Sequence, residues 1–249
     1  DVIILLIPDE AHGKVFETSI KPYFKEGGTL IVAHGFSLHF GLIKDYEKWN
    51  IGMVAPKAVG TAVRQNFLEG KGIFSLYSEF HKINEDLEKI LLEVAKGIGS
   101  IKVLKTSFKT ECETDLFGEQ VVLTGGIISL FTKAFETLTE AGYDKEISFY
   151  ECVRELKLIV DLIHEKGLLG MYNSISNTAK FGGFKTGDFL IDESVKARMK
   201  EVLKCIQNGE FANSFIEAAA KPEYKKEIET KYKTGKFAEV EKNILNLLK

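Results

Sequence analysis

The sequence predicts an α/β domain with a parallel sheet, followed by an all-α domain. The first hundred residues contain short apolar runs rich in β-branched residues, whereas apolar residues recur mostly at helical spacing beyond them. The chain has 249 residues, of which 45% are hydrophobic and 28% charged, an ordinary globular composition for one or two domains. The change of pattern places a boundary near residue 105, which predicts domains over residues 1–105 and 106–249.

Three apolar runs are predicted to be strands: Val2–Ile7, Thr29–Ala33 and Ile51–Ala55. Their apolar residues do not alternate with polar ones, a pattern typical of strands buried on both faces of a parallel sheet. A helix-length segment, Glu10–Glu26, separates the first two runs and ends at the helix-stopping pair Gly27-Gly28. Strands separated by helices indicate βαβ units and therefore a parallel sheet.

A polar residue closely follows each predicted strand: Asp9, His34 and Lys57. Ligands of open parallel sheets bind at the carboxyl ends of the strands. Because these ends meet at one edge of the sheet, we expect the three side chains to share a rim.

The remainder of the chain is predicted to be mostly helical. From about residue 77, apolar residues at helical spacing up to Ile98 predict one long amphipathic helix that ends near Gly97–Gly99. After a short segment, Ile101–Ser107, further helical patterns cover Glu113–Val122, Leu130–Glu140, Phe149–Glu165 and Glu193–Gln207.

Charge and cysteine content restrict the partners and the compartment. The 33 basic and 36 acidic residues give a net charge of −3, which argues against a nucleic-acid-binding surface. Three scattered cysteines do not provide a disulfide framework, which favours a reducing, cytoplasmic compartment. The apolar runs fall short of membrane-spanning length, so no membrane partner is expected.

Two pairs of acidic residues carry the main chemical signal. Asp115 and Glu119 are four positions apart, as are Glu151 and Glu155, so an α-helix places each pair on one face. The second pair adjoins apolar residues, which predicts a partly buried position where the charges need a cation. Carboxylate oxygens suit Mg²⁺, and two such pairs on facing helices can hold two metal ions. For any single pair, a solvated surface position is the simpler interpretation.

The sequence around these pairs resembles one enzyme family. The motifs that carry the resemblance are AHGF at 33–36, VAPK at 54–57, ETDLFGEQ at 113–120, FYECVRELKLIVDLI at 149–163 and SISNTAKFG at 174–182. Together, in order and spacing, they resemble ketol-acid reductoisomerase, also called acetohydroxyacid isomeroreductase, in its shorter class I form. The resemblance implies a Rossmann-like NADPH-binding domain over 1–105 and a knotted helical domain over 106–249, which binds metal and substrate and forms the dimer.

The resemblance also implies a role for particular residues and a reaction. It assigns metal binding to Asp115, Glu119, Glu151 and Glu155, catalysis to His34, Lys57 and Glu119, the substrate carboxylate to Ser176, and cofactor binding to Pro8, Asp9 and Gly60. In the family reaction, two Mg²⁺ ions promote alkyl migration in 2-acetolactate or 2-aceto-2-hydroxybutyrate. NADPH then reduces the product to a 2,3-dihydroxy acid, in valine, isoleucine and leucine biosynthesis. The family's dimers share residues between active sites.

Each assignment has a structural alternative. Taken singly, His34 is explained as a residue of the turn after its strand, Lys57 as a solvated loop lysine and Ser176 as a helix cap. Two other functions stay open on the residues alone: a metal-independent hydroxy-acid dehydrogenase with a helical second domain, and a non-catalytic, metal-binding oligomerisation fragment.

The glycine fingerprint of dinucleotide-binding turns, G-x-G-x-x-G, does not occur in the 249 residues. On the family resemblance, Asp1 begins roughly the fourth strand of the nucleotide-binding sheet. We therefore expect about 60–90 further residues, with the phosphate-binding turn, to precede it in the parent protein. The sheet domain is accordingly expected to be incomplete at its N-terminus.

Overall fold

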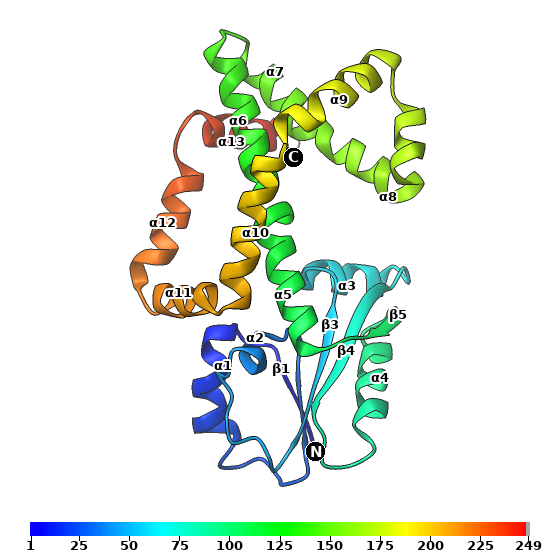
Figure 1. Ribbon diagram of the computed structural model, residues 1–249, viewed down its shortest axis with the longest axis vertical. Helices are drawn as coiled ribbons and strands as arrows, with labels where there is room; N and C mark the ends of the chain where they lie inside the picture. Colours follow the sequence, from blue (N-terminus) through cyan, green and yellow to red (C-terminus); the bar gives the residue numbers. More distant parts are fainter. Residues whose placement is uncertain (248–249) are drawn as a thin grey trace. The chain divides into compact units, whose positions relative to one another are not determined.

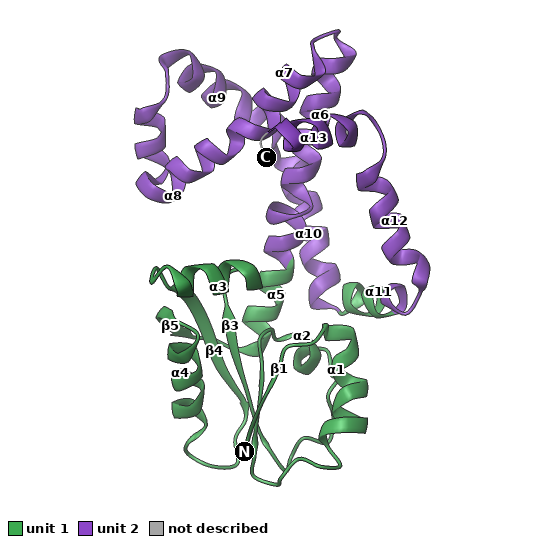
Figure 2. Cartoon of the chain, turned by 180° about the vertical axis from the view of Figure 1, so that it is seen from behind, with its two compact units in different colours: residues 1–116, 209–216 green, residues 117–208, 217–249 purple. Residues whose placement is uncertain are grey.

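The computed structural model describes residues 1–247, which form two compact units. Unit 1 contains residues 1–116 and 209–216, and unit 2 contains residues 117–208 and the chain from 217 onwards, as Figure 2 shows in green and purple. Unit 1 holds a sheet with helices, and the described part of unit 2 consists of helices and their connections. The predicted succession of an α/β domain and an all-α domain is confirmed.

Within residues 1–247, five strands form one sheet in the order β1-β2-β3-β4-β5 (Figure 1). The strands are β1 (Val2–Leu5), β2 (Thr29–Val32), β3 (Asn50–Pro56), β4 (Ile73–His81) and β5 (Ser100–Lys105). Neighbouring strands are parallel except β3 and β4, which are antiparallel. The sheet is thus mixed, where the sequence predicted a purely parallel one.

The helices of unit 1 cover both faces of this sheet. They are α1 (Asp9–Val15), the π-helical turn η1 (Phe16–Ile20), α2 (Phe36–His39), α3 (Gly60–Leu68), α4 (Leu87–Gly97), α5 (Phe108–Gly118) and most of α11 (Glu210–Ala219). Phe16 of η1 packs with Leu30 and Ile51 against one face, and Leu91 of α4 packs with Ile31 against the other. Strands β2 and β3 are therefore buried on both faces, as predicted.

Two predictions about the sheet are wrong. The predicted long helix from residue 77 is strand β4 up to His81, and α4 begins only at Leu87. Ile73, Ser75 and Tyr77 are buried while Phe74 is exposed, which is the alternation of a strand. The prediction missed this alternation because the apolar residues farther along the chain recur at helical spacing.

The second correction concerns β1, which stands at one end of the sheet. Leu5 is buried, but Val2 and Ile4 are exposed by 44% and 45%. Within residues 1–247 the run lies at the sheet margin and buries alternate residues, so the predicted burial on both faces is not found there.

Unit 2 is built from helices that continue from α5. They are η2 (Glu119–Leu123), α6 (Gly126–Glu140), α7 (Lys145–Phe149), η3 (Tyr150–Arg154), α8 (Glu155–Ser174), α9 (Asn177–Leu190), α10 (Glu193–Gln207), α12 (Pro222–Lys233) and α13 (Lys236–Leu247). Phe135, Phe149, Val240 and Ile244 form a buried cluster where α6, α7 and α13 meet. Helix α8 is interrupted at Gly167, whose φ of 70° is non-helical.

Helices α8 and α9 expose a large apolar surface. Leu169 is 75% exposed, Phe184 77% and Phe189 81%, and the other exposed apolar residues of these helices are Leu158, Val160, Leu168, Phe181 and Leu190. Large apolar side chains that are exposed in such number along two helices are typical of an interaction surface.

One helical stretch, Phe108–Glu140, is long and apolar enough to cross a membrane by length and composition. Of the 18 consecutive residues that meet this criterion, 6% are buried. This corrects the expectation that no segment reaches that length. The beginning of the stretch packs within unit 1, where Phe108, Cys112 and Leu116 are buried.

Candidate active site

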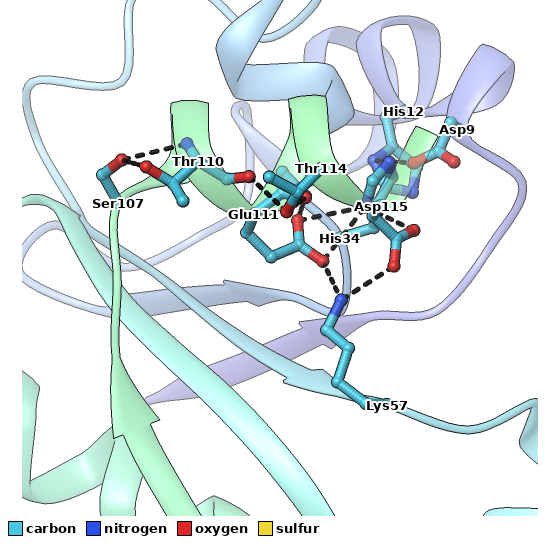
Figure 3. A network of polar contacts seen from close by, with 10 residues as sticks. Asp9, His12, His34, Lys57, Ser107, Thr110, Glu111, Thr114 and Asp115 are labelled. Atoms are coloured by element: carbon cyan, nitrogen blue, oxygen red, sulfur yellow. Dashed lines mark hydrogen bonds and ion pairs between the residues drawn. The ribbon is translucent and has the colours of Figure 1, made fainter. Parts of the chain in front are cut away.

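Glu111 of α5 is the centre of a charged cluster in unit 1 (Figure 3). Its side chain is only 1% exposed, yet three donors surround it. Nδ1 of His34 donates to Oε2 at 3.1 Å, the backbone N–H of Gly35 donates to the same oxygen at 2.8 Å, and Nζ of Lys57 donates to Oε1 at 2.7 Å. The buried carboxylate is therefore paired and hydrogen-bonded on both oxygens, as burial of a charge requires.

Asp115 lies one helical turn after Glu111 and belongs to the same cluster. Its Oδ1 accepts a hydrogen bond from Nζ of Lys57 at 2.8 Å, and its Oδ2 lies 3.6 Å from Nδ1 of His34. Figure 3 shows the Lys57 ammonium pointing between the two carboxylates. Lys57 thus bridges two acids that α5 presents on one face.

The sheet explains why these residues meet. His34 follows β2 and Lys57 follows β3, and these strands are parallel, so both residues lie at the same edge of the sheet. Asp9 follows the parallel strand β1 and lies near His34, close enough to influence its charge (Figure 3). The rim predicted from Asp9, His34 and Lys57 is present, and α5 places Glu111 beside it.

Glu111 was not predicted from the sequence as a site residue, although its spacing to Asp115 indicates it. It precedes Asp115 by four positions, just as Asp115 precedes Glu119, so the acids repeat along one helical face. Of these three acids, Glu111, which precedes the ETDLFGEQ motif, is the one that the fold buries.

The charges of the cluster reinforce one another. For His34, burial opposes the imidazolium, but the hydrogen bond and charge of Glu111 outweigh it and raise the pKa. Burial likewise opposes the ammonium of Lys57, but the carboxylate of Glu111 raises its pKa. For Glu111, burial favours the acid form, yet His34 and Lys57 hold its pKa below the ordinary value. Glu111 and Lys57 are consequently charged at neutral pH.

The other acids predicted to bind metal lie in unit 2. Glu119 is the first residue of η2, Glu151 lies in η3, and Glu155 begins α8. A π-helical turn thus begins at Glu119 and another lies between Glu151 and Glu155, a feature frequent at functional sites. Glu151 and Glu155 are exposed in the single chain, which corrects the prediction that they are partly buried.

The remaining predicted residues begin helices. The Oγ atom of Ser176 accepts a hydrogen bond from the backbone N–H of Ala179 at 3.1 Å and so caps α9. Pro8 directly precedes α1, and Gly60 is the first residue of α3, with open space around it. Capping uses the hydroxyl oxygen of Ser176 as an acceptor, and its O–H remains a donor.

The cluster has the donor set of a cation site. One ligand atom from each of His34, Glu111 and Asp115 lies within 4.8 Å of the other two. Carboxylate oxygens are the ligands that Mg²⁺ prefers, and the Lys57 ammonium already occupies a cation position between Glu111 and Asp115. The residues present therefore fit a divalent cation bound at Asp115.

The sheet with its polar rim and the helical second unit define a class of protein in which an α/β domain precedes an all-α domain. A semialdehyde dehydrogenase NAD-binding protein from Cupriavidus necator shares this fold at a TM-score of 0.59 and 14% identity, over 84% of this chain and 78% of that one. At this identity the likeness concerns the fold alone.

Closer comparisons determine the family. Residues 1–103 match the acetohydroxy acid isomeroreductase NADPH-binding domain, and residues 108–249 match the ketol-acid reductoisomerase C-terminal domain. The chain belongs to the ketol-acid reductoisomerase family, which confirms the resemblance carried by its motifs.

Individual relatives agree with this assignment. The NADP(+) ketol-acid reductoisomerase of Saccharolobus solfataricus is 45% identical over 219 residues, 87% of this chain and 65% of that protein. An NADH-preferring ketol-acid reductoisomerase from an uncultured archean has a TM-score of 0.95 at 38% identity, over 99% of this chain and 75% of that chain. The chain thus spans about two thirds of the length of the relatives it matches.

Proposed function

We propose that the protein acts as a ketol-acid reductoisomerase in valine, isoleucine and leucine biosynthesis. It rearranges 2-acetolactate or 2-aceto-2-hydroxybutyrate in a Mg²⁺-dependent alkyl migration, and it reduces the product with NADPH to the 2,3-dihydroxy acid. The observation that carries the proposal is the charged cluster of His34, Lys57, Glu111 and Asp115 at the carboxyl edge of the sheet, in a chain of this family.

Asp115, Glu119, Glu151 and Glu155 would hold two Mg²⁺ ions. When bound, they polarise the ketone and the hydroxyl of the substrate, which favours the alkoxide that alkyl migration needs. Two observations support this role: the carboxylate donors, and the Lys57 ammonium that is already paired with Asp115.

The protein groups around the metal position hold charges and protons. Glu111 accepts the hydrogen bond from Nδ1 of His34 and compensates the charge of Lys57, so that both side chains are held in place at the acidic site. Glu119 acts with His34 and Lys57 in catalysis. Ser176 donates its O–H to the substrate carboxylate, which adds no charge to the site.

The two parts of the chain divide the work. Residues 1–105 contribute to the NADPH site, with Pro8, Asp9 and Gly60 near the cofactor, and residues 106–249 bind metal and substrate and form the dimer. The family matches to an NADPH-binding domain and a C-terminal domain support this division near residue 105. The compact units divide at 116/117 instead, because α5 begins within the packing of the sheet unit.

The protein functions as a homodimer or higher homo-oligomer in the cytoplasm, without a nucleic-acid or membrane partner. The apolar surface of α8 and α9 is of the kind that a second copy buries. Because Glu151 and Glu155 lie exposed beside this surface, a partner subunit can bring its own site to them.

The test is NADPH oxidation by the intact parent protein with 2-acetolactate. We expect turnover with Mg²⁺, none after chelation, and loss of both isomerisation and reduction in Asp115→Asn. Asp161→Asn, which removes an exposed acid paired with Lys157, is the matched control and should keep full activity. Turnover that persists without divalent cations would identify a metal-independent dehydrogenase instead. A fully active monomer in sedimentation would contradict the shared sites.

A further inference from the structure

We propose that the Lys57 ammonium occupies, in the metal-free protein, the cation position beside Asp115, and that a divalent cation binds by displacing it. Lys57 then lowers the metal affinity of the site and keeps its acids in place until the metal arrives. The inference rests on the proposed metal-binding role of Asp115 and deepens it.

The contacts of Lys57 support this stand-in role. Nζ lies 2.8 Å from Oδ1 of Asp115 and 2.7 Å from Oε1 of Glu111, and its side chain is 27% exposed. Oδ2 of Asp115 lies 3.6 Å from Nδ1 of His34, beyond hydrogen-bonding distance. Oδ1 of Asp115, the atom that accepts from Lys57, is therefore the oxygen for which a metal must compete.

A metal ion and the ammonium cannot share this position. Mg²⁺ binds carboxylate oxygens at about 2.1 Å, so an ammonium on the same oxygen would sit close to a doubly charged cation. Repulsion between charges at such distances is strong in a partly buried site. Binding at Oδ1 of Asp115 therefore requires that Nζ move away.

Glu111 lowers the free-energy cost of displacing Lys57 from Asp115. It is almost fully buried and keeps its own contact with Nζ, so Lys57 can release Asp115 while retaining one carboxylate partner. The long, flexible lysine stem allows such a movement, which the rigid fork of an arginine would restrict. Glu111 thus anchors Lys57, and Asp115 is the partner that exchanges.

The test is Mg²⁺ titration of the chelator-treated, full 249-residue chain by calorimetry. Lys57→Met removes the competing charge at similar length, and we expect about tenfold tighter Mg²⁺ binding than in the unaltered protein. Lys57→Arg restores a cation that is harder to displace, so Mg²⁺ should bind no more tightly than in the unaltered protein. Equal or weaker binding in Lys57→Met would overturn the displacement.

Lys21 provides a matched control. Its ammonium also lies between two carboxylates, 3.0 Å from Glu17 and 2.8 Å from Asp45, and its side chain is 29% exposed. Lys21→Met therefore removes a similar surface bridge in the same unit, and Mg²⁺ affinity should not change. A gain in Lys21→Met equal to that in Lys57→Met would show a general charge effect and overturn the inference.

Asp115→Asn separates this inference from the proposed function. If Mg²⁺ binds the original protein and Asp115→Asn weakens it, the metal role holds, and Lys57→Met decides the displacement alone. In the Asp115→Asn background, Lys57→Met should give less than a twofold gain, because the carboxylate charge for which Lys57 and Mg²⁺ compete is absent. If the original protein binds no Mg²⁺, both proposals fail.

A second measurement needs no variant at Lys57. The ¹⁵N resonance of the Lys57 side chain should shift as Mg²⁺ is added, in step with the calorimetric binding curve. The Lys21 resonance should stay unchanged. A Lys57 signal that does not respond while Mg²⁺ binds would overturn the displacement even if the substituted protein fails to fold.

Discussion

The backbone N–H of Gly35 donates a hydrogen bond of 2.8 Å to Oε2 of the buried Glu111, which joins the loop after β2 to helix α5. The same loop carries His34, so this contact sets the distance between the imidazole and the acids of α5. The approach is possible because Gly35 has no side chain. A Cβ atom there would lie 2.8 Å from the carbonyl oxygen of Phe108 and 3.1 Å from Oε2 of Glu111.

Gly35→Ala should therefore destabilise the protein and misplace His34. We expect a loss of about 1–3 kcal/mol in the free energy of unfolding, because the new methyl group meets backbone atoms that cannot move aside without strain. Urea unfolding measures it. Gly97→Ala is the control, since a Cβ at this position in α4 meets nothing within 4 Å and should be neutral or slightly stabilising. Equal stability of both variants would contradict the close approach.

Glu111→Gln should destabilise the metal-free protein in a pH-dependent manner. The folded state holds the pKa of Glu111 below its ordinary value of 4.5, so its charge stabilises the fold above that pH. This contribution is lost as pH falls through the lowered pKa. We expect a cost of roughly 3–5 kcal/mol near neutral pH, because Lys57 and His34 lose a buried partner.

The difference between Glu111→Gln and the original protein should shrink below about pH 4, where the glutamate of the original protein begins to take up its proton. Urea unfolding at a series of pH values, in the presence of a chelator, follows it. A cost that is the same at every pH would show that Glu111 stabilises the fold through packing alone.

His12 should stabilise the turn that precedes the rim. It is 2% exposed; Nε2 donates to the carbonyl of Ile7 at 2.9 Å, and Nδ1 is hydrogen-bonded to Oγ of the buried Ser37 at 2.9 Å. His12→Phe keeps the bulk but leaves both partners unsatisfied, at a cost of about 1–3 kcal/mol in unfolding free energy. His12→Gln keeps a donor and an acceptor and should recover part of the loss. The exposed His164→Phe serves as control, and a comparable loss there would refute the role of the two bonds.

Asp192 should stabilise α10 from its N-terminus. Its Oδ1 accepts hydrogen bonds from the backbone N–H groups of Ser194 at 2.9 Å and Val195 at 3.2 Å. Asp192→Ala should cost about 1 kcal/mol in the free energy of unfolding, whereas Asp192→Asn keeps the cap and most of the stability. Circular dichroism with chemical denaturation distinguishes the two variants. If Asn and Ala behave alike, the cap contributes little.

The local pattern of the sequence determined much of this fold. Helix α10 begins at Glu193 and ends at Gln207 as predicted, because its apolar period and its Asp192 cap are properties of neighbouring residues. Strands β2 and β3 were likewise predicted, since strands buried on both faces need uninterrupted apolar runs. The parallel order of these strands then predicted that His34 and Lys57 would meet.

Only the tertiary structure decided the rest. The antiparallel direction of β4 depends on how its alternating residues pair with β3, which helical spacing farther along the chain concealed. Glu111 contacts His34 across 77 positions of sequence, and its burial depends on where α5 packs. Hydrophobic periodicity and capping act over a few residues, so the sequence shows them directly. A buried charge is stable only when the fold brings its partners to it, and that pairing is a property of the assembled sheet and helix.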